Sequence, residues 1–312
     1  MSRLSWRVRL ALVTGLAAVA ALAVPAGAGA VRPATGGVTH AAAAHRVVAY
    51  YQTQYDQDAY VSPAPLAGKA TDVLVAAVHL QDDATIHLND DPPSAAKFDP
   101  MWTDLNALQD NGVRVEAMLG GAAQGSFAHL AADFDRYYPP LRAFLSDHGF
   151  DGLDLDIEEP FSLADTEHLI DTLHADFGAD FTVTLSPVAS DLSGGSSFSG
   201  GFSYPQLQQD KGDAIAWYNG QFYNGWGSLD GTGDYDAIVA AGIPAAKVVA
   251  GALTNSANGG SGYVPLDTLT GTVSALAGEH PDLGGVAGWE YFNATGAASP
   301  ADWYGTVAGA MP

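Results

Sequence analysis

The stretch Phe150–Pro160, which reads FDGLDLDIEEP, constrains the fold more than any other part of the chain. Aspartate is disfavoured in β-strands, so a strand that carries acids at alternate positions needs a chemical reason to keep them. Successive side chains of a strand point to opposite faces, which would separate the acids from the aliphatic residues. The acidic face would hold Gly152, Asp154, Asp156 and Glu158. The aliphatic face can pack against helices, so we expect the acids to point inward or along a cleft.

Three carboxyls on one strand face predict proton-transfer chemistry. At a spacing of about 6.5–7 Å in a poorly solvated site they cannot all ionise at low cost, so at least one should hold a proton near neutral pH, as a general acid must. An exposed strand with a solvated acidic face is one alternative, and a metal site is another. A calcium EF-hand loop does not fit, because Glu159 occupies the sixth position counted from Asp154, where that loop needs glycine. A magnesium site needs fewer ligands and stays open.

Composition limits the classes of function. The 312-residue chain carries a formal net charge of −23, which would repel nucleic acids and other polyanions. It has no cysteine, which excludes disulfides, thiolate metal sites and a cysteine nucleophile. A hydrophobic content of 47% is enough for a large core. Because disulfides are excluded, the fold must depend on packing alone.

The first residues are typical of an export signal rather than of a folded domain. Arginines precede an apolar run, Leu10–Val24, which ends in Pro25 and in small residues that resemble a cleavage site. The run is shorter than the roughly 20 residues of a membrane span. We expect residues 1–30 to be a secretory signal peptide and residues 31–44 to be a flexible alanine-rich segment. The mature protein would then be secreted, extracellular and free of the membrane.

Short β-rich apolar runs recur through residues 45–312, and segments long enough for helices lie between most of them. The expected strands are Arg46–Tyr51, Asp72–Leu80, Val113–Leu119, Phe150–Glu158, Phe181–Ser186, Ile215–Tyr223, Lys247–Leu253 and Gly285–Glu290. The expected helices are Pro100–Gln109, Phe134–His148, Leu163–Phe177, Tyr235–Ala241 and Leu266–Ala277. This alternation predicts one α/β domain with parallel strands and crossover helices, a single (β/α)8 TIM barrel. A doubly wound open sheet is the alternative.

A barrel of this kind places its chemistry at the C-terminal ends of its strands. Acids, amides, aromatics and glycines gather at those ends in this sequence, which supports a site there. They are Tyr50, Tyr51 and Gln52, Gly120 and Gly121, Glu158, Tyr223 and Asn224, and Trp289 and Glu290.

The acidic strand and two later strands are similar to those of a known family. DGLDLDIE fits the DxxDxDxE signature of glycoside hydrolase family 18, whose acids fall here on Asp151, Asp154, Asp156 and Glu158. QFYN at residues 221–224 and GGVAGWE at residues 284–290 resemble two further strands of that family. More narrowly, the chain resembles fungal endo-T-type endo-β-N-acetylglucosaminidases, in stretches from YYQT at residue 50 to GWEYFN at residue 288. It departs from the family at Met118, where serine is usual, which affects how the buried acids are hydrogen-bonded.

This resemblance implies a retaining reaction in which the N-acetyl group of the substrate makes the attack. Glu158 would protonate the leaving glycosidic oxygen and would then activate water. Asp156 would accept the acetamido N–H, and Asp154 would share a proton with Asp156. Tyr223 would align the acetamido oxygen, and Trp289 would form the floor under the sugar. No metal and no organic cofactor is implied.

The resemblance also implies residues that bind the sugar chain. Further subsites would be lined by Tyr51, Gln52, Asn89, Asp90, Gln221, Asn224 and Trp226. Gly120 and Gly121 would either let the substrate approach the backbone or form a tight strand-to-helix turn. The implied partner is an N-glycan or a chito-oligosaccharide, bound by a monomer.

Several functions stay open at this point. The favoured one is an endo-β-N-acetylglucosaminidase that cleaves the chitobiose core of high-mannose N-glycans, and a chitinase is the second. The same acids would serve both enzymes, so the catalytic residues do not separate them. A sugar-binding barrel without catalysis and a metal phosphoesterase are the remaining alternatives, and the presence of Glu158 disfavours the sugar-binding barrel.

Overall fold

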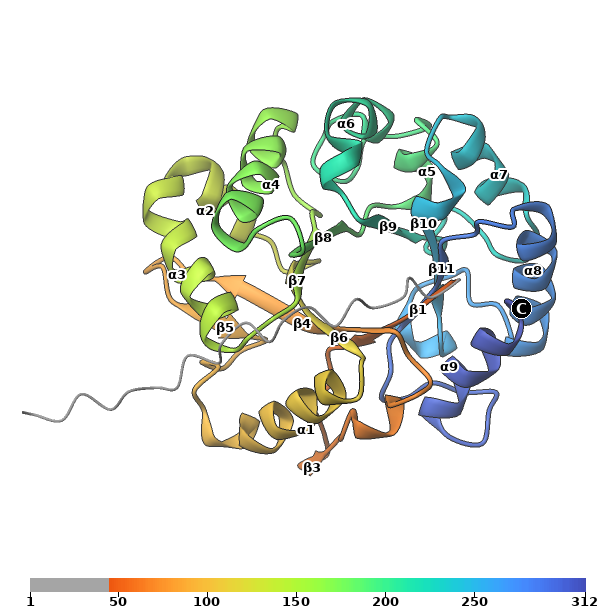
Figure 1. Ribbon diagram of the computed structural model, residues 1–312, viewed down its shortest axis with the longest axis horizontal. Helices are drawn as coiled ribbons and strands as arrows, with labels where there is room; N and C mark the ends of the chain where they lie inside the picture. The colour runs from red at the N-terminus through yellow and green to blue at the C-terminus, as the bar shows by residue number, and fades with distance from the viewer. Residues whose placement is uncertain (1–44) are drawn as a thin grey trace, which may run out of the picture. The chain divides into compact units, whose positions relative to one another are not determined.

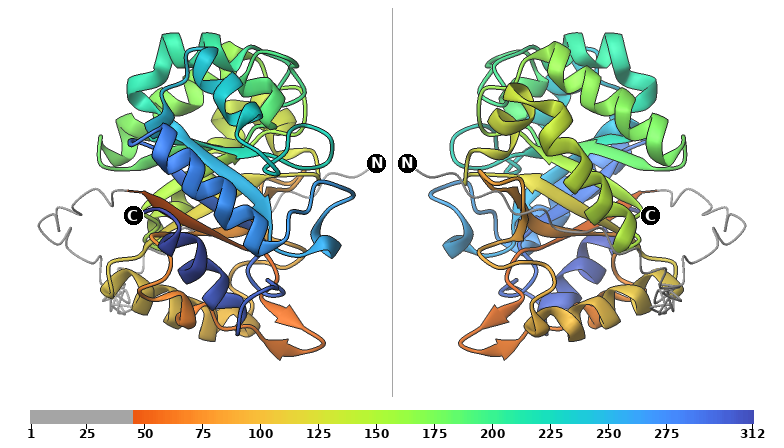
Figure 2. Two further views of the ribbon diagram at one scale, coloured as in Figure 1. Left: turned by 90° about the vertical axis from the view of Figure 1, so that its right-hand side faces the viewer. Right: turned by 90° about the vertical axis from the view of Figure 1, so that its left-hand side faces the viewer.

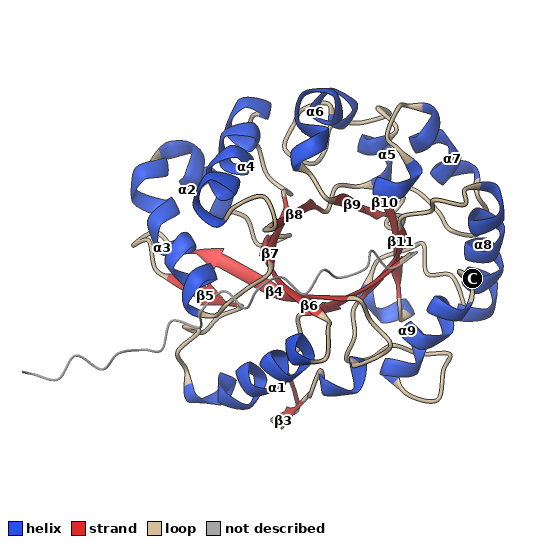
Figure 3. Cartoon of the chain, in the orientation of Figure 1, coloured by secondary structure: helices blue, strands red, loops and turns tan. Residues whose placement is uncertain are grey.

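The computed structural model describes residues 45–312 and contains a closed barrel of parallel strands (Figures 1 and 3). The barrel strands are β1 (Arg46–Tyr51), β4 (Asp72–Leu80), β6 (Arg114–Gly120), β7 (Gly152–Asp156), β8 (Thr182–Leu185), β9 (Trp217–Gln221), β10 (Val248–Leu253) and β11 (Gly285–Trp289). Strand β1 pairs with β4 on one side and with β11 on the other, which closes the ring and rules out an open sheet. The predicted (β/α)8 fold is therefore confirmed. The predicted signal peptide and alanine-rich segment lie outside the described residues.

Helices surround the barrel on its outer side (Figure 3). They are α1 (Asp99–Asp110), α2 (Ser126–Ala132), α3 (Phe134–Asp147), α4 (Leu163–Phe177), α5 (Ala189–Leu192), α6 (Tyr204–Lys211), α7 (Gly233–Ala240), α8 (Leu266–Glu279) and α9 (Pro300–Gly309). The expected helices are all present, as α1, α3, α4, α7 and α8, with small shifts at their ends. Helices α2, α5, α6 and α9 are additions to the predicted set. Between residues 45 and 312, no helix combines the length and the hydrophobicity that a membrane span needs.

Two small β additions lie outside the ring. Strand β5 (Ile86–Leu88) pairs antiparallel with the end of β4. Strands β2 (Tyr55–Asp56) and β3 (Ala59–Tyr60) form a hairpin, orange in Figure 2, which projects away from the barrel. Both additions follow the C-terminal ends of β1 and β4, so they belong to the loops on the side where a barrel of this kind places its chemistry.

Strand β7 shows how the sequence builds the two layers of the core. Leu153 and Leu155 are fully buried in the apolar layer between the strands and the helices. Asp154 and Asp156 alternate with them and therefore point into the barrel. A smaller apolar cluster fills much of that interior, and its largest members are Tyr50, Met118 and Trp217.

The register of neighbouring strands decides which residues lie beside these acids. Asp154 lies level with Met118 of β6 on one side and with Thr184 of β8 on the other. Asp156 lies level with Gly120 of β6, at the end of that strand. Parallel pairing thus fixes which side chains can reach each carboxyl before any loop is considered.

Candidate active site

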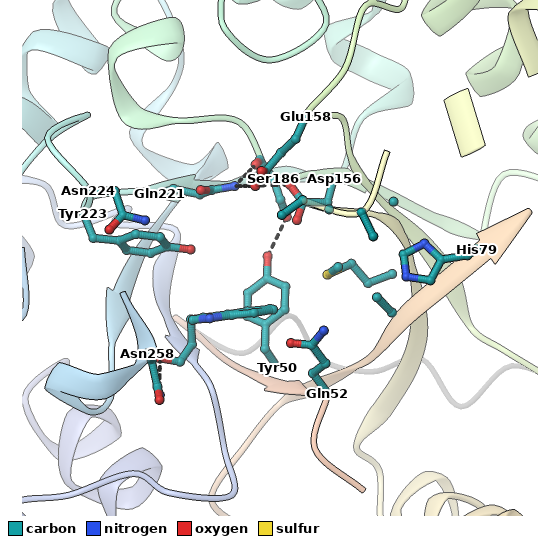
Figure 4. Close-up of a pocket in the computed structure, with 17 residues that line it drawn as sticks. Tyr50, Gln52, His79, Asp156, Glu158, Ser186, Gln221, Tyr223, Asn224 and Asn258 are labelled. Carbon is teal, nitrogen blue, oxygen red and sulfur yellow. Dashed lines mark hydrogen bonds between the residues drawn. The ribbon is translucent and has the colours of Figure 1, made fainter. Parts of the chain in front are cut away.

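A cavity of about 420 Å³ lies at the C-terminal ends of the barrel strands (Figure 4). The residues that the sequence singled out and that line it are Gln52, Gly120, Gly121, Asp156, Glu158, Gln221, Tyr223, Asn224 and Trp289. They come from the ends of β1, β6, β7, β9 and β11, which are far apart in the chain. The closed barrel therefore brings these residues to one place.

Three carboxyls follow one another from the barrel interior to this cavity. Asp154 is fully buried, Asp156 is 6% exposed, and Glu158 is half-buried and points into the cavity (Figure 4). Strand β7 ends at Asp156, so the prediction of a strand through Glu158 is wrong by two residues. The loop that carries Glu158 is held in place, because the Glu158 carbonyl accepts a hydrogen bond from Gln124 Nε2 at 2.8 Å.

Asp154 is surrounded by hydrogen-bond donors. It accepts from Thr184 Oγ1 at 2.5 Å, from Ser186 Oγ at 2.6 Å and from Asn219 Nδ2 at 3.1 Å. Met118, which stands where serine is usual in the similar family, packs in the apolar interior cluster instead. The donors that fix this acid therefore come from β8, β9 and the loop after β8, and β6 contributes none of them.

Asp154 and Asp156 interact through their charges rather than through a shared proton. No hydrogen bond joins the two carboxyls in the described structure, so the expected proton sharing is not formed there. Burial raises the pKa of Asp156 well above its usual range, and the nearby charges of Glu158 and Asp154 raise it further. Burial also raises the pKa of Asp154, against the opposing effect of its hydrogen bonds. The surroundings thus favour a protonated Asp156, in agreement with the expectation that the three acids do not all ionise.

The side-chain amide of Gln221 joins the two upper acids. Its Nε2 atom lies 3.2 Å from Asp156 Oδ1, 3.3 Å from Glu158 Oε1 and 2.9 Å from the Ser186 carbonyl oxygen. An amide nitrogen carries two hydrogens, so it cannot donate fully to three acceptors at once. A change at one carboxyl will therefore alter the hydrogen bonding of the other.

Aromatic rings shape the rest of the cavity. Trp289 is half-buried and meets the ring of Tyr50 edge to face, with centroids 5.2 Å apart. The Tyr50 hydroxyl bonds to Ser186 Oγ at 2.5 Å, which connects this support to the same serine that binds Asp154. Burial and the neighbouring acids raise the pKa of Tyr223 well above its usual range, so its hydroxyl keeps its hydrogen and can donate.

The two glycines at the end of β6 have different functions. Both have positive φ angles, +95° at Gly120 and +88° at Gly121. A Cβ atom on Gly120 would lie 2.5 Å from the Asp156 carbonyl oxygen and 2.5 Å from the Phe127 ring. A Cβ on Gly121 would lie 3.4 Å from Asp156 Oδ2, inside the cavity lining. Gly120 is therefore needed for the tight turn, and Gly121 keeps the space beside the Asp156 carboxyl open.

The expectation that Tyr51 lines a subsite is wrong. Its side chain is fully buried in the outer apolar layer, and its hydroxyl donates to the Val61 carbonyl at 2.6 Å. Tyr50 lines the cavity in its place. Neighbouring residues of a strand face opposite sides, so only one of the two tyrosines can reach the barrel interior.

Three other expected subsite residues lie outside this cavity. Asn89 and Asp90 line a second cavity of about 490 Å³, which shares Gln52 with the first. The Asn89 amide is used within the fold, because it donates to the Gln52 carbonyl at 3.0 Å. Trp226 packs against the ring of Phe198.

Sequence reasoning missed several residues of the cavity. They are His79, Met118, Ser186 and Asn258. Ser186 could have been found, because it is the last residue of the predicted strand Phe181–Ser186 and the other site residues also lie at strand ends. Asn258 lies in a loop that no strand pattern marks, yet its amide donates to the Trp289 carbonyl at 3.0 Å and so supports that ring.

Possible metal ligands are few in the part of the chain that the structure describes. One group that could hold an ion is Asp236, Glu279 and His280. His280 Nε2 lies 2.8 Å from Asp236 Oδ1, so a hydrogen bond accounts for two of its members. None of these residues lines the cavity, and the Asp154 carboxylate inside the barrel is already occupied by protein donors.

Comparison with known proteins agrees with this geometry. A model of the family described as glycosyl hydrolases family 18 matches residues 46–256. The chitinase ChiC from Aspergillus fumigatus is 45% identical, with a TM-score of 0.79, and the match covers 86% of this chain and 100% of that chain. A fungal endo-β-N-acetylglucosaminidase of family 18 is 41% identical, with a TM-score of 0.80, over 85% of this chain and 97% of that chain. Chitinase 2 from Rhizopus oligosporus is 30% identical over 204 residues, 60% of this chain, and the match spans 35% of that relative's length.

Proposed function

The chain belongs to glycosyl hydrolases family 18, and on this premise we propose that it cleaves the β-1,4 bond between two N-acetylglucosamine residues. The observation that carries the proposal is the line of Asp154, Asp156 and Glu158, which leads into a cavity that Tyr223 and Trp289 also line. Family 18 enzymes use the N-acetyl group of the substrate in place of an enzyme nucleophile. The residues present supply the other groups that such a reaction needs.

In the first step the acetamido oxygen attacks the anomeric carbon of its own sugar, and the bond to the leaving oxygen breaks. Glu158 gives its proton to that oxygen. Tyr223 donates a hydrogen bond to the acetamido oxygen and Asp156 accepts the acetamido N–H, so the attacking atom is aligned. Alignment of an internal nucleophile can supply several kcal/mol of the barrier reduction. The product is an oxazolinium ion whose positive charge lies beside Asp156.

In the second step water attacks the anomeric carbon from the side that the leaving group has vacated. Glu158, now ionised, takes a proton from this water, and the acetamido group is restored. Two displacements at the same carbon retain its configuration. Asp154, held by its donors, keeps a fixed position under Asp156 throughout.

We infer that the substrate is the chitobiose core of high-mannose N-glycans. The 41% identity to a fungal endo-β-N-acetylglucosaminidase supports this choice. The second cavity, which adjoins the first and is lined by His79, His129, Asn89, Asp90 and Gln124, offers hydrogen-bonding groups to sugars beyond the cleaved bond. Mass spectra of a digested high-mannose glycoprotein should show one N-acetylglucosamine left on each modified asparagine. The Glu158→Gln protein is the control and should leave the glycoprotein intact.

A chitinase is the second candidate, and the 45% identity to the Aspergillus fumigatus chitinase favours it. The same digestion, run in parallel on chitin tetramer, separates the two functions. Cleavage of the tetramer together with an untouched glycoprotein would replace the N-glycan assignment with this one. Failure to cleave either substrate would contradict the proposal as a whole.

We also propose that the protein is exported and acts outside the cell, because the pattern of residues 1–30 is that of a signal peptide. The intact mass of the protein recovered from the culture medium will locate the cut. A recovered mass that still includes residues 1–30 would contradict this proposal.

A further inference from the structure

Glu159, the residue after the proton donor, is a buried acid that the mechanism does not use. Its side chain is 6% exposed. Gly125 N donates to both of its carboxyl oxygens at 2.9 Å, and Phe127 N donates to Oε1 at 2.8 Å. Burying a carboxylate costs free energy unless the group is paired or hydrogen-bonded, and these backbone donors meet that requirement. The acid is therefore held by the chain that follows β6.

The donors belong to the start of α2, which has no cap of its own. Gly125 precedes this helix with φ +126° and has no side chain that could accept from the first turn. The first N–H groups of a helix need acceptors from outside it. Glu159 supplies one from 34 positions further along the chain. A local cap would stabilise α2 alone, whereas this one also fixes the backbone next to Glu158.

Two further hydrogen bonds join the same two loops. Gly121 N donates to the Asp156 carbonyl at 2.8 Å, and Gln124 Nε2 donates to the Glu158 carbonyl at 2.8 Å. Together with the Glu159 carboxyl, they fasten the chain after β7 to the chain after β6 before and after the Glu158 Cα atom. The Glu158 side chain leaves on the other side and points into the cavity (Figure 4).

The Glu158 carboxyl has few contacts that could hold it in place. Between residues 45 and 312 its one hydrogen-bond donor is Gln221 Nε2, at 3.3 Å. The direction of the side chain therefore depends on its backbone. A general acid must lie within hydrogen-bond reach of the oxygen that it protonates. A misplacement of about 1 Å can lower the rate about 100-fold, so the backbone at Glu158 has to be held firmly.

We propose that Glu159 is a positioning residue, which fixes the Glu158 backbone so that the proton donor reaches the glycosidic oxygen. It lies one residue beyond the acidic signature and acts through Glu158, without touching the substrate. This inference rests on the proposed function, because that function makes Glu158 the proton donor. It distinguishes Glu159 from an acid that only stabilises α2, since a purely structural acid would not affect proton transfer selectively.

The test compares two leaving groups. A sugar leaves as an alkoxide that needs a proton, and this substrate is whichever of chitin tetramer and high-mannose glycoprotein the wild type cleaves. A dinitrophenyl β-glycoside of chitobiose releases a stable phenolate that needs none. Glu159→Gln keeps the volume but turns an amide N–H toward Gly125 N. It should lower kcat/KM about tenfold for the sugar leaving group and less than about twofold for dinitrophenolate. An equal loss on both substrates would overturn the proposal.

Glu290 provides a matched control. It is 7% exposed, directly follows the cavity residue Trp289, and accepts from Thr53 N at 2.8 Å and from Gln52 N at 3.2 Å in the loop after β1. It is thus a second buried acid that ties two loops together, but it does not adjoin the proton donor. Any loss of kcat/KM in Glu290→Gln should be the same for both substrates. A dependence on the leaving group as large as that of Glu159→Gln would overturn the proposal.

A double variant tests whether Glu159 acts through Glu158. Adding Glu159→Gln to Glu158→Gln should cause no further loss on the sugar leaving group, because the group to be positioned has already lost its proton. A further tenfold loss would contradict the inference. A wild type that cleaves none of the substrates overturns this inference together with the proposed function. An active wild type with equal losses in Glu159→Gln overturns this inference alone.

Hydrogen exchange of the wild-type protein tests the contact without any variant that has to fold. The amide protons of Gly125 and Phe127 should exchange far more slowly than those of a free peptide, because the Glu159 carboxyl accepts from both. Exchange of both amides at the rate of a free peptide, in otherwise protected protein, would show that the contact does not exist and would overturn the proposal.

Discussion

Two acids inside the same barrel, Asp154 and Glu116, have opposite surroundings. Both are fully buried, and the strand register places Glu116 nearer the N-terminal end of the barrel than Asp154. Asp154 accepts three hydrogen bonds, whereas both carboxyl oxygens of Glu116 are buried without a partner among the described residues. Donors therefore surround the acid that supports the reacting groups, and the acid that lies away from them receives none.

Glu116 is tolerated as a neutral acid. Burial raises its pKa well above the usual range and the charge of Asp72 raises it further, against the opposing effect of Arg114. Gly152 makes room for the side chain, since a Cβ there would lie 3.0 Å from Glu116 Cγ. The comparison teaches that burial alone does not make an acid useful. Hydrogen-bond donors, and access to a cavity, distinguish the acids of the active site from this one.

The largest effect on activity is expected at Glu158, the one of the three acids that points into the cavity. Glu158→Gln removes the proton donor and should lower kcat about 10²–10⁴-fold, measured on a chromogenic chitobiose glycoside. The unfolding free energy should change by less than about 0.5 kcal/mol, because the side chain is half-buried and not part of the core. A variant that keeps the wild-type rate would remove Glu158 from the mechanism.

The next effect tests the donors around Asp154. Asp154→Ala would leave Thr184, Ser186 and Asn219 without their common acceptor. Unsatisfied buried donors are costly, so the unfolding free energy should fall by about 3 kcal/mol in urea titrations. Asp154→Asn keeps one acceptor oxygen, so its unfolding free energy should fall by less than that of Asp154→Ala. Equal losses in the two variants would mean that the donors are not what holds this acid.

At Glu116 we expect a substitution to raise the unfolding free energy, the opposite of its effect at Asp154. Glu116→Met replaces an unpartnered buried carboxyl by an apolar side chain of similar volume, and should raise the unfolding free energy by about 1–2 kcal/mol at pH 7. Urea or thermal unfolding of the two proteins measures the difference. A loss of stability on this substitution would show that Glu116 has a favourable partner after all.

The pH dependence of that gain follows from the raised pKa of Glu116. Because the pKa is higher in the folded than in the unfolded protein, the folded state binds more protons above the unfolded value of about 4.3, and stability falls as pH rises. The gain in Glu116→Met should therefore be larger at pH 7 than at pH 4. Glu116→Gln, which also no longer titrates but stays polar, should show the same increase of the gain from pH 4 to pH 7, with a smaller gain at each pH.

The smallest expected effect on activity is that of removing a single tyrosine hydroxyl. Tyr223→Phe should lower kcat about tenfold with little change in KM, because it removes one hydrogen bond to the reacting acetamido group. Tyr204 provides the matched control, since its hydroxyl is buried without a partner in the described structure. Tyr204→Phe should keep full activity. Equal activity in the two variants would contradict the alignment function of Tyr223.

The sequence predicted the barrel strands because apolar runs recur between helical segments, but it could not orient all of them. In β7 the acids mark the inner face, so Asp156 and Glu158 were placed correctly toward a cleft. In β1, RVVAYY is apolar on both sides, so nothing in the pattern tells which tyrosine faces inward. Both tyrosines stand at the end of the predicted strand, and in the structure Tyr50 lines the cavity whereas Tyr51 packs in the outer apolar layer. The closure of the barrel determines which tyrosine of β1 faces the interior, and the apolar pattern does not encode that closure.

The missed helices have a related explanation. Helix α9 begins with a clear signal, because Ser299 accepts from Asp302 N at 3.2 Å and proline occupies the first turn. Helix α6 begins in the same way, with Ser203 as its cap and Pro205 in its first turn. Both helices are short, so their apolar periodicity is weak. Start signals deserve more weight than periodicity in segments of this length.

Gln221 has a consequence that reaches beyond its contacts. The amide nitrogen of Gln221 has two hydrogens for three acceptors. In the free enzyme, all three acceptors are therefore satisfied only while one of the two carboxyls keeps a proton. When an incoming acetamido group engages Asp156, the amide can turn its second hydrogen fully toward Glu158. Occupancy of the sugar site would thereby change the hydrogen bonding of the proton donor through one rotatable amide.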